Sequence, residues 1–363
     1  MPCQASWSTI PPPAIGGPMT ETLAIGWDLG GAHLKAAAAT AEGQIAAAWQ
    51  VPCTLWRGLE HLTYAIDEIR PRLGSLGRHG LTMTGELVDL FENRQAGVEQ
   101  LAAVMAQALP DADLRIYAGA EGFCPIADAS RHWSAVASAN WHGSAAFAAS
   151  CRDEGLFVDV GSTTTDLVPF RAGNVEYAGY SDAERLASDE LVYTGVTRTP
   201  VMAIAERVPF AGVSQRVMAE HFATIADVHR LTGELPEDAD QHATADGRGK
   251  SEGESARRLA RMLGRDADAS DLSPWRQLAW HLSQRQGDML WTAADRVLSR
   301  GVLTADAPII GAGVGRFLAR RLAERLRRPY VDFRELVDGE AQATEWAARC
   351  APAAAVAVLA ARW

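Results

Sequence analysis

Short apolar runs alternate with amphipathic stretches along the first half of the chain. The apolar runs are flanked by turn residues, which predicts buried strands at residues 23–28, 34–39, 44–51, 80–85 and 114–118. Apolar side chains at helical spacing predict helices at residues 59–69, 98–109 and 135–149, the last of them rich in alanine. This alternation of strands and helices is typical of an α/β fold.

The second half opens in the same way, with a strand at 156–160, a tight loop and a strand at 165–170. Two strands joined by so short a loop must be antiparallel, so we expect mixed rather than purely parallel sheets. The pattern becomes mainly helical after Val201, and the polar stretch 234–254 predicts a mobile loop. The remaining predicted elements are a strand at 308–310, a glycine turn at 311–315, a helix at 316–327, a strand at 330–333 and an Ala-rich helix at 353–361.

Each half of the chain has an aspartate at the end of its first buried strand, followed two residues later by a glycine. Asp28 precedes Gly30 and Gly31, and Asp159 precedes Gly161. Glycine lets backbone N–H groups approach phosphate oxygens, and the aspartate can bind a cation. Two such loops in one chain predict a duplicated phosphate-binding core with a cleft between its halves.

The second Asp-Gly loop carries the stronger signal. Its two aspartates, Asp159 and Asp166, enclose four hydroxyl residues: Ser162, Thr163, Thr164 and Thr165. A structural turn rarely needs so many hydroxyl groups, which favours binding of a phosphate or of a metal–phosphate complex. Because Mg²⁺ prefers a few carboxylates together with phosphate oxygens, we expect it at Asp28, Asp159 and Asp166.

The other glycine-containing segments are less specific. In the first loop, His33 stands in the hairpin that presents the amides, and Lys35 adds a point charge for phosphate. Taken alone, this loop is equally well explained as a glycine hairpin with an ordinary terminal aspartate. A third cluster includes Gly311 and Gly313 and lies between a strand and a helix. No acidic ribose partner follows it at Rossmann spacing, so we interpret it as a wall for an anion or a nucleoside.

Three polar segments and one aromatic position add candidates for substrate binding and catalysis: Glu86, Trp141, Tyr193, Arg198, Asp246 and Lys250. Glu86 follows a strand and is expected to face the cleft. Tyr193 and Arg198 lie in a loop before the helical region, and Asp246 and Lys250 lie in the polar stretch. Each polar segment alone is more often a solvated surface, and Trp141 either packs a helix or lines an aromatic pocket.

The composition excludes several classes of protein. The 363 residues suffice for two domains, and 48% hydrophobic and 22% charged residues are ordinary for a globular protein. A net charge of −11 argues against generic binding to nucleic acid or to an anionic membrane. The five cysteines lack CxxC spacing and no apolar run reaches the ~18 residues of a membrane span, which predicts a cytoplasmic protein. Residues 1–20 carry no secretory signal and are predicted to be a disordered leader.

The paired Asp-Gly loops, the hairpin after each and the late glycine turn resemble the actin-like ATPase superfamily of sugar kinases, chaperone ATPases and actin. Residues 26–35 and 159–166 are more closely similar to its hydantoinase/oxoprolinase-related branch, and within it to tetrahydromethanopterin-linked one-carbon-pathway proteins. The narrower resemblance is carried by residues 83–87, 138–141, 193–200, 222–228 and 244–250. It implies a two-lobed actin-like (ribonuclease H-like) fold, with lobe I at 21–150, lobe II at 151–363 and the site in the cleft between them.

The resemblance also implies a transferase rather than a kinase. Archaeal members of this group join an (aminomethylfuranyl)methyl diphosphate to the phenol of a tyramine derivative in methanofuran biosynthesis, and release diphosphate. Bacterial members are expected to make methylofuran, with tyrosine or a tyramine derivative as the acceptor. The implied partners are these small molecules, with Mg²⁺ as the cofactor, no nucleic acid, no membrane, and formation of a homodimer left open.

The residues agree with this chemistry. A furfuryl diphosphate ionises readily once its diphosphate charge is neutralised, which is the expected task of Lys35, the loop amides and Mg²⁺. A phenol with a pKa of about 10 needs a base at neutral pH, for which Glu86 and Asp246 are the candidates. Two alternatives use the same loops for ATP, namely a kinase or hydantoinase/oxoprolinase-like hydrolase, and a non-catalytic actin-like scaffold. The sequence leaves this choice open, and the glycine turn at 311–315 fits either ligand.

Overall fold

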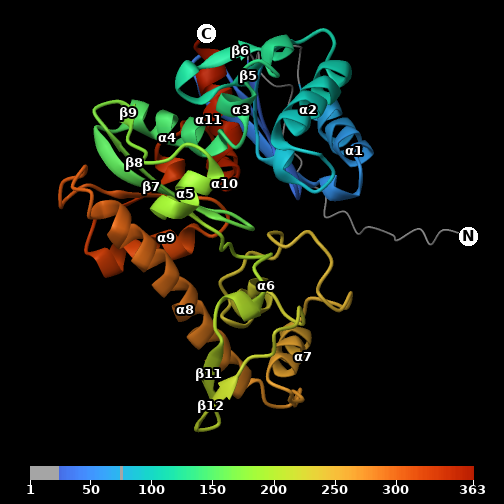
Figure 1. The fold of residues 1–363 in the computed structure, drawn as a ribbon, viewed down its shortest axis with the longest axis vertical. Coiled ribbons are helices and arrows are strands. Elements are labelled where there is room, and N and C mark those ends of the chain that lie inside the picture. Colours follow the sequence, from blue (N-terminus) through green and yellow to red (C-terminus); the bar gives the residue numbers. More distant parts are fainter. Residues whose placement is uncertain (1–23, 74–76) are drawn as a thin grey trace, which may run out of the picture.

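The computed structural model describes residues 24–73 and 77–363, so the predicted leader at 1–20 lies outside the described residues. Two mixed β-sheets with their helices form the upper part of the molecule, and a smaller group of elements extends below them (Figure 1). The long helix α8 (Ser273–Leu298) runs from the second sheet into this smaller group. Within the described ranges, no helix combines the length and the apolarity that a membrane crossing demands.

The first sheet has the strand order β3-β2-β1-β4-β5-β6. Its strands are β1 (Ala24–Leu29), β2 (His33–Ala39), β3 (Ile45–Pro52), β4 (Arg78–Met83), β5 (Asp113–Tyr117) and β6 (Phe123–Pro125). β1 pairs antiparallel with β2 and parallel with β4, so the sheet is mixed as expected. The predicted strands of the first half are confirmed, with bounds that differ by one or two residues.

The second sheet repeats this arrangement around its own Asp-bearing strand. Its strands are β7 (Glu154–Val160), β8 (Thr165–Arg171), β9 (Asn174–Val175), β10 (Leu191–Val192), β13 (Ile309–Ala312) and β14 (Tyr330–Asp332). β7 pairs antiparallel with β8 and parallel with β13, as β1 does with β2 and β4. Asp28 and Asp159 therefore occupy equivalent places in two similar sheets.

A core of small side chains joins the two sheets. α11 (Ala351–Ala361) packs on β1, β2 and β4, and α4 (Asn140–Cys151) packs on β7 and β8 as well as on α11. The approach of α11 to β1 is so close that a Cβ at Gly26 would clash with the backbone of Ala353 and Ala357. The predicted C-terminal helix is thus confirmed, and it belongs to the core of the N-terminal sheet. The other helices of the upper part are α1 (Glu60–Ile69), α2 (Arg94–Ala108), α5 (Asp182–Ser188), α9 (Arg316–Leu326) and α10 (Ala341–Arg349).

The prediction of one continuous Ala-rich helix at 135–149 is wrong. The chain forms a short α3 (Trp133–Val136), breaks, and then begins α4 at Asn140. Ser138 adopts a φ of 54° in the break, a conformation that interrupts helical hydrogen bonding and costs free energy in a residue with a Cβ. Its side chain is bonded to groups from distant parts of the sequence, which the local pattern did not reveal.

The smaller group contains α6 (Ile225–Leu231), α7 (Glu252–Met262) and a hairpin of β11 (Arg207–Phe210) and β12 (Val213–Arg216). The hairpin was missed by the mainly helical prediction for this region. Residues 234–250 are irregular, as expected, but α7 begins before the predicted end of the loop. The segment is also bonded to the upper part, because Arg349 donates to both carboxylate oxygens of Asp238 at 2.8 and 2.9 Å.

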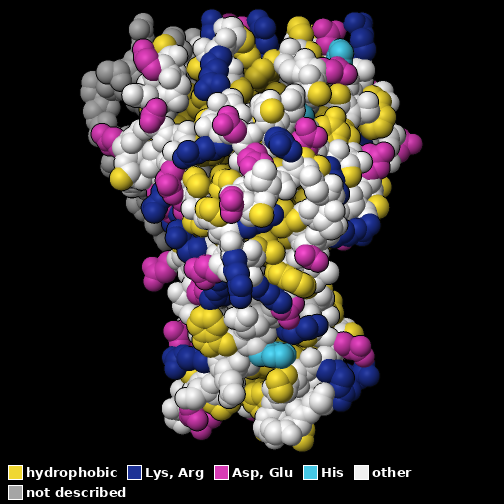
Figure 2. Space-filling view, turned by 90° about the vertical axis from the view of Figure 1, so that its left-hand side faces the viewer, with side chains coloured by type: hydrophobic (Ala, Val, Ile, Leu, Met, Phe, Trp, Pro, Cys, Tyr) yellow, Lys and Arg dark blue, Asp and Glu magenta, His cyan; other side chains and the backbone are white. Residues whose placement is uncertain are grey.

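Figure 2 views the molecule from the side of α8 and α9 and shows Lys and Arg side chains gathered where it narrows toward the smaller group. Two arginines of α9 stack on tryptophans of α8. Arg321 lies 5.1 Å from the ring centre of Trp280, and Arg325 lies 4.7 Å from that of Trp291. These contacts help to hold the two helices together.

Candidate functional site

A cavity of about 570 Å³ brings the two Asp-Gly loops together. Most of the candidate residues line it: Asp28, Gly30, Gly31, His33, Lys35, Asp159, Gly161, Ser162, Thr163, Thr164, Asp166, Tyr193 and Arg198. The other candidates lie outside its wall: Thr165, Glu86, Trp141, Asp246, Lys250, Gly311 and Gly313. The volume is that of a small-molecule site.

The first loop joins β1 to β2 by a tight turn. The N–H of Gly30 donates to the carbonyl of His33 at 3.0 Å, which reverses the chain and brings Lys35 opposite Asp28 in the ladder. Lys35 Nζ lies 3.3 Å from Asp28 Oδ2. Burial raises the pKa of Asp28, and Lys35 offsets part of that rise. The second carboxylate oxygen of Asp28, Oδ1, is buried and has no hydrogen-bond partner among the described residues.

The second loop joins β7 to β8 in the same way, since the N–H of Gly161 donates to the carbonyl of Thr164 at 2.9 Å. Asp159 is 9% exposed, and no ion pair to it is found in the described chain. Burial raises its pKa to about 7; Lys35 opposes that rise, while Asp166 and Asp28 add to it. The second loop therefore presents a carboxylate whose charge the protein does not neutralise.

Residues 195–198, between β10 and α6, contact the backbone of the second loop. The N–H groups of Thr197 and Arg198 both donate to the carbonyl of Ser162, at 3.1 and 2.9 Å. Gly195 lies so close to the loop that a Cβ there would clash with the backbone at Thr163. Gln286 of α8 donates to the carbonyl of Gly195 at 2.9 Å. Gly195 and Gln286 were not predicted, because nothing local in their sequence signals a contact with a loop so far away.

The three predicted metal-binding aspartates differ in how much of each carboxylate remains available to a cation. Asp166 is already paired with the buried Arg185 at 2.9 Å. Asp28 retains an unpartnered oxygen and Asp159 retains its whole carboxylate. Within residues 24–73 and 77–363, no three His, Cys, Asp or Glu side chains cluster as a preformed metal site. Mg²⁺ is usually bound by one or two carboxylates together with phosphate oxygens of the substrate, so Asp28 and Asp159 would suit it once a diphosphate is bound.

The side chains that line the cavity carry a net negative charge, so an anionic ligand would need a cation to bind with it. Five aspartates line it against three basic side chains, which are Lys35, Arg185 and Arg198. With two of those bases already paired to aspartates, the wall has more negative than positive charge. A diphosphate entering such a site needs additional positive charge, which a bound Mg²⁺ would supply.

Glu86 lies behind the cavity rather than in it. It is 1% exposed, and its Oε1 accepts hydrogen bonds from Ser138 at 2.8 Å and Arg94 at 3.2 Å. Burial raises the pKa of Glu86, and Arg94 offsets part of the rise. Ser138 Oγ also lies 3.2 Å from Asp182 Oδ2, and both Ser138 and Asp182 line the cavity. Glu86 thus reaches the site only through two residues that were not predicted.

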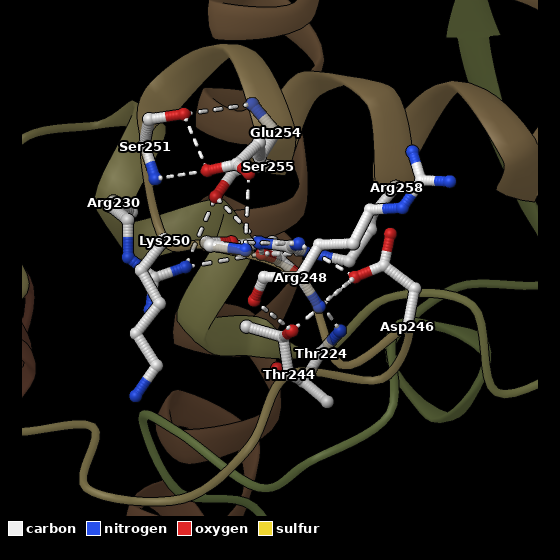
Figure 3. Close-up of polar contacts among 12 residues, drawn as sticks. Thr224, Arg230, Thr244, Asp246, Arg248, Lys250, Ser251, Glu254, Ser255 and Arg258 are labelled. Atoms are coloured by element: carbon white, nitrogen blue, oxygen red, sulfur yellow. Dashed lines mark hydrogen bonds and ion pairs between the residues drawn. The ribbon is translucent and has the colours of Figure 1, made fainter. Parts of the chain in front are cut away.

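Asp246 and Lys250 belong to an ion-pair cluster of the smaller group (Figure 3). The carboxylate of Asp246 accepts from Arg258 at 3.0 Å and from Arg261 at 3.3 Å. Burial would raise the pKa of Asp246, but hydrogen bonds from the Arg248 backbone and from Arg258 outweigh it and lower the pKa. Lys250 donates to the carbonyl of Asp240. These placements do not support a direct catalytic role for Asp246.

Trp141 is buried in an aromatic cluster with His142, Tyr177 and Tyr180. The guanidinium of Arg185 lies 4.1 Å from the centre of its ring, so Trp141 supports the arginine that pairs with Asp166. This is the packing alternative of the two interpretations given above. The aromatic side chains that do line the cavity are exposed ones, Trp56 at 39% and Tyr193 at 59%.

The third glycine cluster packs against the back of the second loop. A Cβ at Gly313, which has a φ of 83°, would clash with the Asp159 carboxylate and the Val160 backbone. The N–H of Gly313 donates to the carbonyl of Ala348 at 2.8 Å, and that of Gly315 donates to the carbonyl of Val160 at 2.8 Å. The turn therefore supports Asp159 from behind.

The sequence of this chain is similar to that of a known family and of two named synthases. The model of the Hydantoinase/oxoprolinase family matches residues 78–338. The chain is 29% identical over 249 residues to the (4-{4-[2-(gamma-L-glutamylamino)ethyl]phenoxymethyl}furan-2-yl)methanamine synthase of Methanocaldococcus jannaschii, covering 68% of this chain and 73% of that one. It is 32% identical over 108 residues to the synthase of the same name from Methanococcus vannielii, covering 30% and 48%.

A solved structure supports the same fold. The nucleotide-free structure of an acetone carboxylase aligns with 91% of this chain and 70% of its own, with a TM-score of 0.56 and 10% sequence identity. At this identity the likeness concerns the fold alone. The fold is that of the actin-like ATPases, as the paired loops and the repeated sheet arrangement predicted.

Proposed function

The chain belongs to the hydantoinase/oxoprolinase family, and from that premise we propose that it is a transferase of methanofuran-type coenzyme biosynthesis. In the proposed reaction, an (aminomethylfuranyl)methyl diphosphate condenses with the phenol of tyrosine or of a tyramine derivative. The products are the furan–phenol ether and diphosphate. The names of the two archaeal relatives, which specify a phenoxymethyl-furan product, support this assignment.

The observation that carries the proposal is the convergence of both Asp-Gly loops on one cavity that also has exposed aromatic side chains. The loops offer amides and hydroxyl groups to a diphosphate, and Trp56 and Tyr193 offer ring faces to a furan or a phenol. The glycine turn at 311–315 favours this ligand over ATP. Its amides at Gly313 and Gly315 are bonded within the protein, and neither Gly311 nor Gly313 lines the cavity.

The reaction breaks one C–O bond and forms another at the same carbon. The bond between the furfuryl carbon and the diphosphate breaks, and its electron pair leaves with the diphosphate. Lys35 and the hydroxyl groups of Ser162 and Thr163 are positioned by the two loops to stabilise that charge as it develops. A Mg²⁺ ion held by Asp28 and Asp159 would supply further positive charge.

The phenol oxygen then bonds to the furfuryl carbon and loses its proton. Asp182 is the carboxylate of the Glu86 cluster that lines the cavity, so we assign it the role of proton acceptor. Arg94, which lies 3.4 Å from Asp182 and 3.2 Å from Glu86, holds the two carboxylates in place. In this scheme Glu86 acts through Ser138 and Asp182 rather than directly.

The proposal is tested with purified protein, a furfuryl-type diphosphate, Mg²⁺, and either tyrosine or tyramine as the acceptor. The expected result is a coupled ether product and free diphosphate in equal amounts. Chromatography with mass spectrometry measures the ether, and a pyrophosphatase-linked assay measures the diphosphate. Brisk ATP turnover without coupling would overturn the proposal in favour of a kinase or hydrolase.

A further inference from the structure

Arg198 and Trp56 form a stacked pair at the edge of the cavity. The guanidinium carbon lies 5.0 Å from the centre of the indole ring, and both residues line the cavity. No carboxylate forms an ion pair with Arg198 in the part of the chain that the structure describes. A guanidinium held against an aromatic face keeps its N–H groups available at its edge, where they can bind an oxyanion.

Each lobe fixes one member of the pair through its Asp-Gly loop. Trp56 lies in the 3₁₀ turn η1 (Leu55–Arg57), and the N–H of Leu55 donates to the carbonyl of Gly31 at 3.2 Å. The N–H of Arg198 donates to the carbonyl of Ser162 at 2.9 Å. The position of the guanidinium is therefore tied to both halves of the diphosphate site.

Two imidazole rings lie beside this pair, and one of them, His33, lines the cavity. The ring centres of His33 and His242 lie 4.7 Å apart, and His242 lies 5.9 Å from Trp56. The Nε2 atoms of both histidines are buried and have no hydrogen-bond partner among the described residues. Burial lowers the pKa of both rings, and Arg198 lowers it further, so both are neutral at pH 7. Each neutral ring carries one N–H and one acceptor nitrogen.

The segment that carries His242 is anchored through the two residues that precede it. Gln50 of β3 donates to Gln241 at 3.3 Å, and Arg230 donates to Asp240 at 2.7 Å. Since His242 is held against lobe I by these bonds, its approach to His33 is a built feature of the site. The corner therefore combines the ring N–H groups of Trp56 and His33 with the positive charge of Arg198, and no carboxylate of the described chain is paired with that charge.

We propose that this corner, formed by Arg198, Trp56 and His33 with His242 packed against His33, is a subsite for the carboxylate of the phenolic acceptor. The inference rests on the proposed function and adds the chemical class that the acceptor must carry. Tyrosine has an α-carboxylate, and the product named for the archaeal relatives has one in its γ-glutamyl group. Tyramine has none, so the corner would distinguish acceptors that share the same phenol.

The test compares tyrosine, γ-glutamyltyramine and tyramine as ligands of the wild-type protein and of Arg198→Gln. Calorimetric titration with each acceptor, and separately with inorganic pyrophosphate and Mg²⁺, measures binding without requiring turnover. We expect wild type to bind at least one carboxylate-bearing acceptor more tightly than tyramine. Arg198→Gln should weaken that acceptor about 10- to 100-fold, as expected for the loss of charge-assisted hydrogen bonds, and leave tyramine and pyrophosphate unchanged.

Two further variants separate the subsite from general effects of losing an arginine. Arg265 stacks on Phe210 at 5.1 Å in the smaller group, away from the cavity, so Arg265→Gln is a matched control that should change no affinity. His242→Phe keeps the ring but removes its N–H donor. It should weaken the carboxylate-bearing acceptor by a smaller factor than Arg198→Gln does.

The possible outcomes are distinct. Equal weakening of tyrosine and tyramine, or loss of pyrophosphate binding in Arg198→Gln, would overturn the inference and assign Arg198 to the diphosphate. A wild-type protein that does not prefer any carboxylate-bearing acceptor would overturn it as well. If the wild-type protein catalyses no coupling but binds carboxylate-bearing acceptors selectively, and Arg198→Gln loses that selectivity, the subsite stands and the proposed reaction fails.

Discussion

Asp28 and Asp159 end equivalent strands, but they face different partners across the ladder. The residue opposite Asp28 on β2 is Lys35, whereas the residue opposite Asp159 on β8 is Asp166. The first loop therefore neutralises its aspartate within the hairpin. The second loop sets two carboxylates side by side and relieves only one of them, through Arg185.

This difference divides the work between two similar loops. The first contributes a fixed ion pair that holds Lys35 in the cavity, and it can form without a ligand. The second contributes a carboxylate whose charge is disfavoured by burial until a cation arrives. A repeated backbone arrangement thus carries two electrostatic roles, and a single cross-strand position decides which one each half has.

The largest effect is expected from Asp159→Asn. Asp159 is a proposed Mg²⁺ ligand, and asparagine lacks the negative charge that would hold the cation beside the diphosphate. Turnover should therefore fall at least ~10²- to 10³-fold. Thermal stability should be unchanged or higher, since asparagine removes a buried charge that burial disfavours. Steady-state kinetics and thermal unfolding measure the two quantities. Asp153→Asn, at an exposed position beside the start of β7, is the control, and full activity in Asp159→Asn would contradict the assignment.

Lys35→Met should lower both activity and stability. It leaves Asp28 buried without its partner, which typically costs about 3 kcal/mol of unfolding free energy. Adding Asp28→Asn should recover most of that stability without restoring turnover, because the lysine is still missing from the diphosphate site. Urea unfolding of the single and double variants tests this. The comparison of the loops fails if the double variant is no more stable than Lys35→Met.

Gln286→Leu should disturb the position of the second loop and leave the first loop unchanged. The side chain is buried and donates to Gly195 and Thr194 at 2.9 Å, and this segment supports the loop through Ser162. Loss of these bonds should raise the dissociation constant for pyrophosphate with Mg²⁺ about 10-fold. Gln284→Leu, on the exposed side of the same helix, is the matched control. An unchanged dissociation constant would show that Gln286 does not position the loop.

The smallest effect concerns the strand that carries the first loop. His79 is bonded to Trp27 Nε1 at 3.1 Å, and burial lowers its pKa from 6.5 to about 4. The fold therefore favours the neutral ring, so its contribution to stability is complete above pH 6.5 and is lost as the pH falls toward 4. Between pH 6.5 and 5.5 the loss is about 1 kcal/mol. His79→Gln keeps an acceptor for Trp27 and should lose less stability than wild type over this interval in urea unfolding; identical slopes would contradict the assignment.

The sequence predicted well those features that depend on neighbouring residues. The strands that end in Asp28 and Asp159 were found within two residues, because an apolar run followed by glycine is a local signal. Both loops also proved to line one cavity, which followed from the repetition of the pattern. Tyr193 and Arg198 line it too, although their segment alone gave no reason to prefer a site over a solvated loop.

The sequence predicted poorly those features that depend on distant contacts. The break at Ser138 arises from its bonds to Glu86 and Asp182, which no helical periodicity reveals. Trp56 and His242 meet only because two segments outside the sheets, far apart in the sequence, lie side by side. Glu86 follows a strand as expected, but the packing of α2 places it behind the cavity, and its position along the chain did not indicate that.

The packing of α11 on β1 has a consequence for the synthesis of the protein. The strand that carries Asp28 leaves the ribosome long before the helix that covers Gly26, because most of the described chain lies between them. At the usual rate of translation the delay between them is roughly 15 to 60 s. During that time one face of the first sheet lacks the helix that covers it. Nascent chains arrested before Ala351 emerges from the ribosome should therefore remain open to protease in the first sheet, and chains from which Ala361 has emerged should not.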